Sequence, residues 1–376
     1  MDPRPSQSAY KVIVVLLTTI VLLLMVLAWR WNGPIESGGG DSSYVFQIAP
    51  VEVNLLRKKY PQIDFTRFYP GLVDVEIDAI QRETYAVRLG YAPLVQFAPL
   101  AMDAEHVKVS PAGYRLGAKP QPWPPRDEDF VVFVYGGSTV FGYGLPDRQT
   151  LVAALQETLV KEFPERSIQC YNFGRGFYYS TQERLLFESH LLAGIVPNAV
   201  IFVDGLNDFF HYDGRPQITE RLHNYLAADV PYPPKPPVTN PEQQVSVASA
   251  VLNRYANNVH MISALGEKFG IQMLFVGQPV PHFQYEKTEQ LYPFFGTDPA
   301  DPVVQLGYPE FKRRGEAGHY GEHFVWLGDA FGATNQPAYL DQAHYTAAAS
   351  LQLARGLTAL VKKRNWTNRD RSPEAR

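Results

Sequence analysis

Short apolar runs and helical stripes alternate through the second part of the chain. Residues 130–135, Phe-Val-Val-Phe-Val-Tyr, form a continuous apolar run, which is typical of a strand covered on both faces. Similar runs predict three further strands, at residues 167–172, 199–203 and 271–276. Apolar residues at helical spacing predict four helices, at residues 151–163, 181–192, 242–269 and 346–363. This alternation predicts an α/β fold, in which a parallel sheet is sandwiched between helices in three layers.

A separate apolar segment lies near the N-terminus. Residues 12–28 carry no charge, and at ~1.5 Å per residue they span most of a ~30 Å hydrocarbon core. Trp29 and Trp31 follow, as expected at a membrane interface, and no small-x-small cleavage site is present. An uncleaved anchor is therefore favoured over a signal peptide. Arg4 and Lys11 precede the segment, which favours a cytoplasmic N-terminus and an extracytoplasmic body, periplasmic in a Gram-negative bacterium.

The residues between the anchor and the predicted sheet contain no motif that indicates chemistry. They mix short apolar stretches with Pro and Gly, and the alternation over Asp74–Ile77 predicts a strand. We expect this stretch to form a small N-terminal lobe of unknown role that packs on the following domain. The chain is thus predicted to comprise an anchor (1–31), a flexible tether (32–43), the lobe (44–125), the main α/β domain (126–364) and a disordered tail (365–376).

Two long segments interrupt the strand and helix alternation of the main domain. Residues 226–241 are rich in proline, and residues 281–340 contain many aromatic residues and glycines. Loops of this length in a compact domain favour a functional rim or lid over surface decoration.

Composition excludes several classes of protein. Hydrophobic residues make up 45% of the chain, which excludes a disordered polymer. The formal net charge of -4 gives no basic excess for binding nucleic acid. Cys170 is the single cysteine, so neither an intramolecular disulfide nor a cysteine-based zinc cluster is possible. Its apolar neighbours predict a buried strand thiol.

Polar residues cluster where ligands bind in parallel α/β sheets, just after the strands end. The first cluster is Gly136-Gly137-Ser138-Thr139, after the first strand, where glycines allow a tight turn that lifts a short side chain into a cleft. No Lys-Ser/Thr pair follows, which excludes a Walker-type phosphate loop, and Val140 excludes a Gly-x-Ser-x-Gly elbow.

Three further segments complete the set of candidate chemistry. Asn207 follows the third strand, where an amide can donate to a developing oxyanion. Asp341 precedes His344 by three residues, so the carboxylate can hold one ring nitrogen and leave the other free to accept a hydroxyl proton. The glycines of Asn172–Phe177 allow close approach of a backbone amide to a substrate. His282 follows the fourth strand, where cleft-lining and structural roles both stay open.

Together these segments resemble the conserved blocks of the SGNH (GDSL-type) hydrolase family over residues 129–362. Ser138 matches the block-one serine, although Gly-Gly-Ser-Thr replaces Gly-Asp-Ser-Leu. Gly205-Leu206-Asn207-Asp208 matches the Gly-x-Asn-Asp block, and Asp341 with His344 matches the final Asp-x-x-His block. The resemblance implies the three-layer SGNH-hydrolase or flavodoxin-like fold and a carboxylic ester hydrolase.

The resemblance also assigns roles to residues. Ser138 is the expected nucleophile, His344 the general base and Asp341 the residue that orients it. The backbone amides of Ser138 and Gly176 and the side-chain amide of Asn207 are the expected oxyanion donors. The position of the family's block-two glycine is occupied by Phe177, one residue after Gly176, so either amide could be the donor, and we expect Gly176.

An anchored extracytoplasmic member of this family is expected to hydrolyse O-acetyl or other short acyl esters of cell-envelope or exported polysaccharide. Three alternatives stay open: O-acetyl transfer between polysaccharides by the same triad, lipase or thioesterase action, and a non-catalytic carbohydrate-binding scaffold. The expected partners are an acylated carbohydrate and the membrane, with no nucleic acid, no metal and no cofactor. The sequence does not indicate an oligomeric state.

Overall fold

The computed structural model describes residues 46–216, 219–226, 229–294 and 302–368. The predicted anchor and tether lie outside these residues. None of the helices in the described ranges is both long enough and apolar enough to cross a membrane. The described residues all belong to one compact unit.

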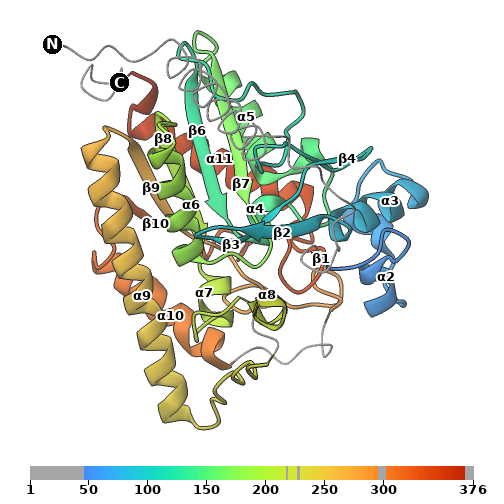
Figure 1. Ribbon diagram of the computed structural model, residues 1–376. Helices are drawn as coiled ribbons and strands as arrows, with labels where there is room; N and C mark the ends of the chain where they lie inside the picture. Colours follow the sequence, from blue (N-terminus) through green and yellow to red (C-terminus); the bar gives the residue numbers. More distant parts are fainter. Residues whose placement is uncertain (1–45, 217–218, 227–228, 295–301, 369–376) are drawn as a thin grey trace, which may run out of the picture. The chain divides into compact units, whose positions relative to one another are not determined.

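A parallel sheet of five strands lies at the centre of this unit (Figure 1), as the apolar runs predict. The strand order is β10-β9-β8-β6-β7, and each neighbouring pair is parallel. The strands are β6 (Phe130–Gly136), β7 (Ile168–Gly174), β8 (Ala199–Asp204), β9 (Gln272–Gly277) and β10 (Phe324–Trp326). The fifth strand, β10, lies inside the segment that the sequence predicts as a long loop, because three residues are too few to give a strand pattern.

Helices cover both faces of the sheet and give the predicted three layers (Figure 1). Alternate residues of β6 point to opposite faces: Val132 and Val134 join one apolar cluster, and Val131, Phe133 and Tyr135 join the other. The first cluster includes residues of α5 and α11, and the second includes residues of α6 and α9. These helices are α5 (Leu151–Glu162), α6 (Ser180–Leu192), α9 (Pro241–Lys268) and α11 (Ala347–Lys363).

Shorter elements follow the strand ends and fill the insertions. The segment 281–340 is not a plain loop, because it contributes α10 as well as β10, and α10 packs on α9. The other helices after residue 126 are α4 (Ser138–Phe141), α7 (Leu206–Phe210), α8 (Thr219–Leu226) and α10 (Pro302–Glu316), with 3-10 turns η3 (Asp147–Gln149) and η4 (Trp366–Asn368). Trp366, in the predicted tail, is buried, and residues 369–376 lie outside the described part.

The N-terminal lobe consists of two small antiparallel sheets and three short helical segments. The strand predicted at Asp74–Ile77 is wrong, because these residues begin α3, whose Ile77 and Ile80 face the core at helical spacing. The Glu76 carboxylate accepts a hydrogen bond from the Val73 amide and so closes the first turn. The elements are β1 (Phe46–Gln47), α2 (Leu55–Lys59), η2 (Phe65–Phe68), α3 (Asp74–Tyr85), β2 (Arg88–Ala92), β3 (Gln96–Pro99), β4 (Met102–Asp103) and β5 (Lys108–Val109).

The lobe packs against the main domain through buried aromatic and polar contacts. Trp123, in the proline-rich connector, stacks on Phe133 of β6 at a ring-centroid distance of 6.0 Å.

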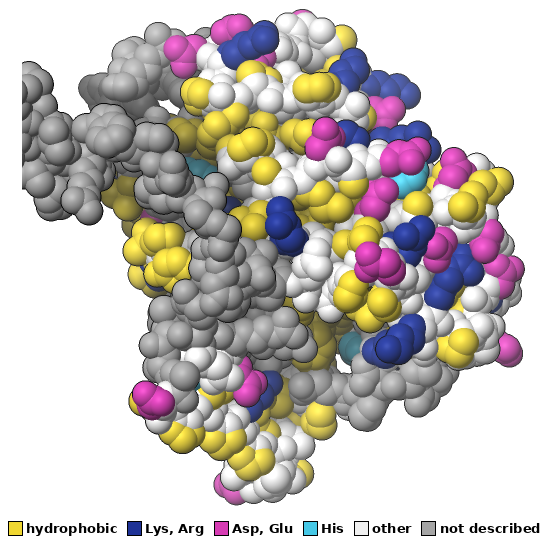
Figure 2. Space-filling view, turned by 45° about the vertical axis from the view of Figure 1, so that its right-hand side comes forward, with side chains coloured by type: hydrophobic (Ala, Val, Ile, Leu, Met, Phe, Trp, Pro, Cys, Tyr) yellow, Lys and Arg dark blue, Asp and Glu magenta, His cyan; other side chains and the backbone are white. Residues whose placement is uncertain are grey.

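On the face of the molecule drawn in Figure 2, Lys and Arg side chains are interspersed with Asp and Glu, so this face carries no continuous basic stripe.

Candidate active site

The nucleophile loop is built by the end of β6 and the start of α4. Ser138 is the first residue of α4, so its backbone N–H has no partner within the helix. The glycines before it permit close packing: a Cβ at Gly136 would lie 2.3 Å from Val140, and one at Gly137 would lie 2.5 Å from the Asn207 amide nitrogen. Gly136 therefore leaves room for Val140 of α4, and Gly137 leaves room for the Asn207 amide next to the nucleophile turn.

The structure brings the three predicted catalytic side chains into one hydrogen-bonded chain. The Ser138 Oγ lies 2.9 Å from His344 Nε2, and His344 Nδ1 lies 2.7 Å from Asp341 Oδ2. The other oxygen of Asp341 accepts from the backbone amides of Ala343 and His344, each at 2.8 Å. The Leu340 amide donates to the His344 carbonyl at 2.7 Å and closes this loop.

The charge state of Asp341 fixes the hydrogen-bond direction through the triad. Burial by itself raises the pKa of Asp341, but the charge and hydrogen bonds of His344, together with the two backbone amides, hold the pKa at about 2. The carboxylate is therefore ionised at neutral pH and accepts the Nδ1 proton of His344. Nε2 is then left with a lone pair that faces the Ser138 hydroxyl, as a general base requires.

The predicted oxyanion donors line one cavity of about 530 Å³ together with Ser138 and His344. The Asn207 side chain donates one hydrogen bond, to the Tyr178 carbonyl at 2.7 Å, and carries a second N–H hydrogen. Gly176 and Phe177 both line the cavity, and Phe177 has a φ of 67°, in the left-handed region that costs a non-glycine residue energy. That Gly176, and not Phe177, supplies the amide stays a prediction.

A second cavity of about 1020 Å³ adjoins the first, and the two share Tyr85, Phe210, Ala343 and His344. Its wall includes α2 of the N-terminal lobe, with Leu55, Leu56 and Tyr60 among the lining residues. His282 also lines this cavity, so of the two roles that the sequence leaves open for it, cleft-lining and structural, the structure places it in the cleft wall. The imidazole of His344 therefore stands between a smaller chamber beside Ser138 and a larger chamber beside the lobe.

The N-terminal lobe contacts both loops that carry the predicted catalytic residues, although its sequence contains no motif that indicates chemistry. Tyr85 Oη donates to Asp341 Oδ2 at 3.2 Å, and Tyr69 Oη donates to the Gly144 carbonyl at 2.7 Å. Lys59 donates to the Gln342 side chain at 2.7 Å. No feature of the sequence indicates these contacts, because a tyrosine at the inner face of a helix has the pattern of an ordinary core residue.

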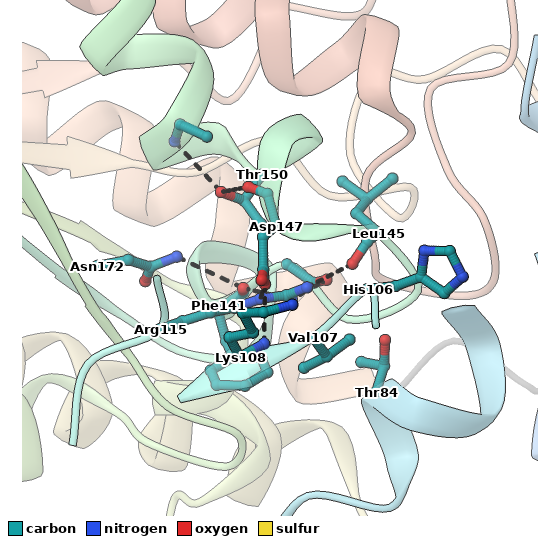
Figure 3. Close-up of polar contacts among 12 residues, drawn as sticks. Thr84, His106, Val107, Lys108, Arg115, Phe141, Leu145, Asp147, Thr150 and Asn172 are labelled. Atoms are coloured by element: carbon teal, nitrogen blue, oxygen red, sulfur yellow. Dashed lines mark hydrogen bonds and ion pairs between the residues drawn. The ribbon is translucent and has the colours of Figure 1, made fainter. Parts of the chain in front are cut away.

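Arg115 is the most deeply buried of the lobe residues that contact the main domain in this way, and none of its side-chain surface is exposed. Figure 3 shows its polar contacts. Its Nε lies 2.9 Å from Asp147, and its Nη1 donates to the carbonyls of Phe141 and Gly142 at 2.9 and 2.7 Å. Nη2 donates to the Leu145 carbonyl at 2.5 Å. Arg115 therefore holds the C-terminal end of α4 and the turn that follows the nucleophile.

Asn172, the first residue of the block-two segment, supports the same helix. Its side-chain amide donates to the Val140 carbonyl at 2.9 Å, and its backbone carbonyl accepts from the Arg115 backbone amide at 3.0 Å. Asn172 thus links β7 to α4 and does not line the cavity around Ser138. Cys170, on the same strand, is buried as predicted, and burial raises the pKa of its thiol.

Within the described residues, no group of three or more His, Cys, Asp or Glu side chains is placed to hold a metal ion.

No protein-family model matches the chain, and no curated protein matches it. Solved structures are similar to it at low identity, and their names describe acyl ester hydrolases.

Three of these structures give the extent of the similarity. An acetyl xylan esterase is 13% identical, with a TM-score of 0.39, over 61% of this chain and 99% of that one. An acetylxylan esterase from Geobacillus stearothermophilus is 17% identical, with a TM-score of 0.37, over 62% and 93%. A protein attributed to the G-D-S-L lipolytic family from Desulfitobacterium hafniense is 17% identical, with a TM-score of 0.37, over 61% and 98%. At these values the similarities do not identify the family or activity of this chain, which must be argued from its own residues.

Proposed function

We propose that the protein is a serine esterase of the SGNH type that hydrolyses short acyl esters, with Ser138 as its nucleophile. The observation that carries this proposal is the continuous hydrogen-bonded chain from Asp341 through His344 to the Ser138 hydroxyl, at 2.7 and 2.9 Å. These distances lie within the range expected of a base and a nucleophile that exchange a proton.

The geometry supports a two-step reaction. Ser138 Oγ forms a bond to the ester carbonyl carbon while its proton passes to His344 Nε2, and the carbonyl electron pair moves onto oxygen. Collapse of this intermediate breaks the bond to the alcohol oxygen, which takes the proton back from Nε2. Water then repeats the sequence on the acyl-enzyme, and the carboxylic acid leaves. Throughout, the ionised Asp341 stabilises the imidazolium cation of His344.

The same cavity supplies donors for the negative oxygen. The free N–H of Ser138 at the start of α4 and the second hydrogen of the Asn207 amide border it, and the amide of Gly176 completes the proposed set. Each preorganised donor of this kind contributes ~3 kcal/mol to the stability of the transition state.

The two chambers support a substrate with a small acyl group and a large alcohol. In the reaction above the leaving alcohol must lie beside His344 Nε2, and the larger chamber of about 1020 Å³ adjoins the imidazole. That chamber is lined by Tyr60, Tyr85 and Phe210, and aromatic faces of this kind pack well against sugar rings. We therefore propose O-acetyl or other short acyl esters of cell-envelope or exported polysaccharide as substrates, met by an anchored enzyme outside the cytoplasm.

The proposal is tested with the full-length protein and p-nitrophenyl esters of increasing acyl length. Wild type is expected to release p-nitrophenol fastest from the acetate, and Ser138→Ala is expected to lose this activity while its melting temperature is retained. Ser189→Ala, in a helix outside the cavity, is the control and should retain full activity. Equal rates for wild type and Ser138→Ala would contradict the proposal, and rates that rise towards octanoate would favour a lipase or thioesterase.

An added acceptor glycan separates hydrolysis from acyl transfer by the same triad. Acetylated polysaccharide is incubated with the enzyme and a second, unacetylated glycan, and the products are analysed by mass spectrometry. Free acetate without acetylation of the acceptor is expected. Ser138-dependent acetylation of the acceptor would assign the transferase function instead.

A further inference from the structure

Tyr85 places a phenol from the N-terminal lobe directly on the carboxylate of the triad. It is the last residue of α3, and its side chain is buried, with 9% of the residue exposed. Its Oη donates to Asp341 Oδ2 at 3.2 Å, and the same oxygen accepts from His344 Nδ1 at 2.7 Å. Together with the two backbone amides on Oδ1, this gives the Asp341 carboxylate four donors.

The ring of Tyr85 also reaches the imidazole through one intermediate side chain. Tyr85 packs edge-to-face on Tyr143, with ring centroids 5.3 Å apart and an interplanar angle of 74°. Tyr143 in turn stacks on His344 at 5.3 Å and 18°. The tyrosine pair therefore contacts the carboxylate at one end and the flat face of the imidazole at the other.

Tyr85 can act only as a donor in this arrangement. Burial, reinforced by the negative charge of Asp341, raises the pKa of Tyr85 well above its usual value, so the phenol keeps its proton. The titratable groups that influence it are Asp341 and two further phenols, Tyr143 and Tyr69, both buried and themselves raised in pKa by burial. The carboxylate is therefore the single charged group among them.

Given the esterase function proposed above, we propose that Tyr85 is a positioning residue that fixes the Asp341 carboxylate against His344, so that the N-terminal lobe completes the active site. The two amides on Oδ1 come from the loop of Asp341 itself and move with it. The bond from Tyr85 comes from a separate helix and ties Oδ2 to the lobe. It also shares the negative charge of that oxygen, which limits how strongly Asp341 favours the protonated imidazole.

Tyr85→Phe in the full-length protein tests this role, because it removes one oxygen atom and keeps the ring. We expect kcat for p-nitrophenyl acetate to fall about tenfold with KM changed less than about twofold, because orientation of the base matters in the transition state. We also expect the acid limb of the pH–rate profile to move to higher pH, because Asp341 without the phenol donor attracts the proton of His344 more strongly.

Tyr114→Phe is the matched control. Tyr114 is buried in the same part of the chain and donates to the Gln121 carbonyl at 3.0 Å, away from the triad. It is expected to lose stability to a similar degree while kcat and the pH profile stay at wild-type values. If Tyr85→Phe keeps the wild-type kcat, or loses kcat without a shift of the acid limb, the positioning role is contradicted.

A measurement without substrate separates this proposal from the esterase function. The nine histidines are labelled with 13C, the His344 signal is assigned with His344→Gln, and its titration is followed by NMR in wild type and Tyr85→Phe. A higher titration midpoint in Tyr85→Phe supports the positioning role even if no ester is cleaved. An unchanged midpoint in an enzyme whose turnover depends on Ser138 contradicts the positioning role and leaves the esterase function standing.

Discussion

Asn207 shows how a single side chain serves the fold and the proposed chemistry together. One hydrogen of its amide goes to the Tyr178 carbonyl at 2.7 Å, which fixes the side chain beside Gly137. The second hydrogen is then held in place before any substrate binds. Preorganisation of this kind is what makes an oxyanion donor effective, since no reorganisation is needed during the reaction.

Replacement of Asn207 by alanine is therefore expected to lower kcat at least about a hundredfold with a small change in KM. Steady-state kinetics on p-nitrophenyl acetate measures the effect. Asn258→Ala is the control, since Asn258 is more deeply buried than Asn207 and donates to Ser180 and Thr181. A kcat within threefold of wild type in Asn207→Ala would remove Asn207 from the proposed oxyanion site.

Three carboxyl groups are buried together behind Asn207, in Glu183, Asp204 and Asp208. Burial, with the negative charge of Asp208 adding to it, raises the pKa of Asp204 to about 8, although a hydrogen bond from Glu183 opposes the shift. Burial and Asp204 likewise raise the pKa of Glu183. The folded protein thus retains protons that the unfolded chain releases near pH 4.

The sign of the pH effect on stability follows from this. A carboxyl whose pKa is raised on folding favours the folded state most below its unfolded value of 3.8, and this contribution is lost as pH rises towards 8. We expect the free energy of unfolding to fall between pH 5 and pH 8 by about 1.4 kcal/mol for each pH unit and each proton retained, and the melting temperature to fall with it. Asp204→Asn is expected to reduce that fall. Thermal unfolding of both proteins at the two pH values provides the measurement, and parallel pH curves would contradict the assignment.

The order of the polar segments along the chain, taken together with their resemblance to the SGNH family, predicts a triad. Ser138, Asp341 and His344 were identified in this way, and the structure brings them together. Tyr85 could not be predicted, since it lies more than two hundred residues from Asp341 and its place on the inner face of a helix is that of an ordinary core residue.

At the scale of elements, the nucleophile depends on a helix of one turn. The helix α4 spans only Ser138–Phe141, so it cannot be stable on its own, and it is held from outside by Arg115 and Asn172. The carbonyls at its C-terminal end accept hydrogen bonds from the Arg115 guanidinium, whose positive charge complements the partial negative charge of that end of the helix. Arg115 lies in a stretch of sequence without a helical or strand pattern, so the sequence does not indicate whether this arginine is buried or solvated.

Arg115→Leu is expected to lower the free energy of unfolding by about 3–5 kcal/mol, because it leaves Asp147, whose side chain is 13% exposed, without its ion-pair partner and removes the Arg115 donor from three carbonyls. Urea denaturation followed by tryptophan fluorescence measures the loss. Arg126→Leu, which removes an arginine with 64% of its side chain exposed, should change the same quantity by less than about 0.5 kcal/mol. Similar losses in the two variants would mean that the Arg115 network contributes little.

The elements that sequence patterns failed to predict are the irregular ones. The main strands and helices are predicted correctly because each carries a continuous apolar run or a helical stripe, whereas β10 has three residues and α10 contains Pro309. The helix α3 was mistaken for a strand at its first turn, where Val73 and Val75 are exposed and only the later Ile77 and Ile80 show the helical face.

At the scale of the whole molecule, the lobe and the α/β domain act as one compact unit from residue 44 onwards. The proposed active site lies where they meet, with the proposed nucleophile and base from the domain and Tyr85 from the lobe. The apolar segment at residues 12–28 lies outside the described residues, and its role as an anchor stays a prediction from its sequence.

Fractionation of cells that express the full-length chain tests the anchor. We expect the protein in the membrane fraction after a carbonate wash, and a variant without residues 1–31 in the soluble fraction. Protease added outside the cytoplasmic membrane should digest the body of the full-length protein. Recovery of the full-length chain in the soluble fraction, or complete protection from protease, would contradict the anchored extracytoplasmic placement.

The central claim, that Ser138 is an activated nucleophile, is tested most directly by a fluorophosphonate probe and mass spectrometry of the labelled peptide. The probe should modify wild type at Ser138 alone, and His344→Ala should slow the labelling at least about a hundredfold, since the hydroxyl then has no base to take its proton. Absence of label on Ser138 in the folded protein, or equal labelling with and without His344, would contradict the account.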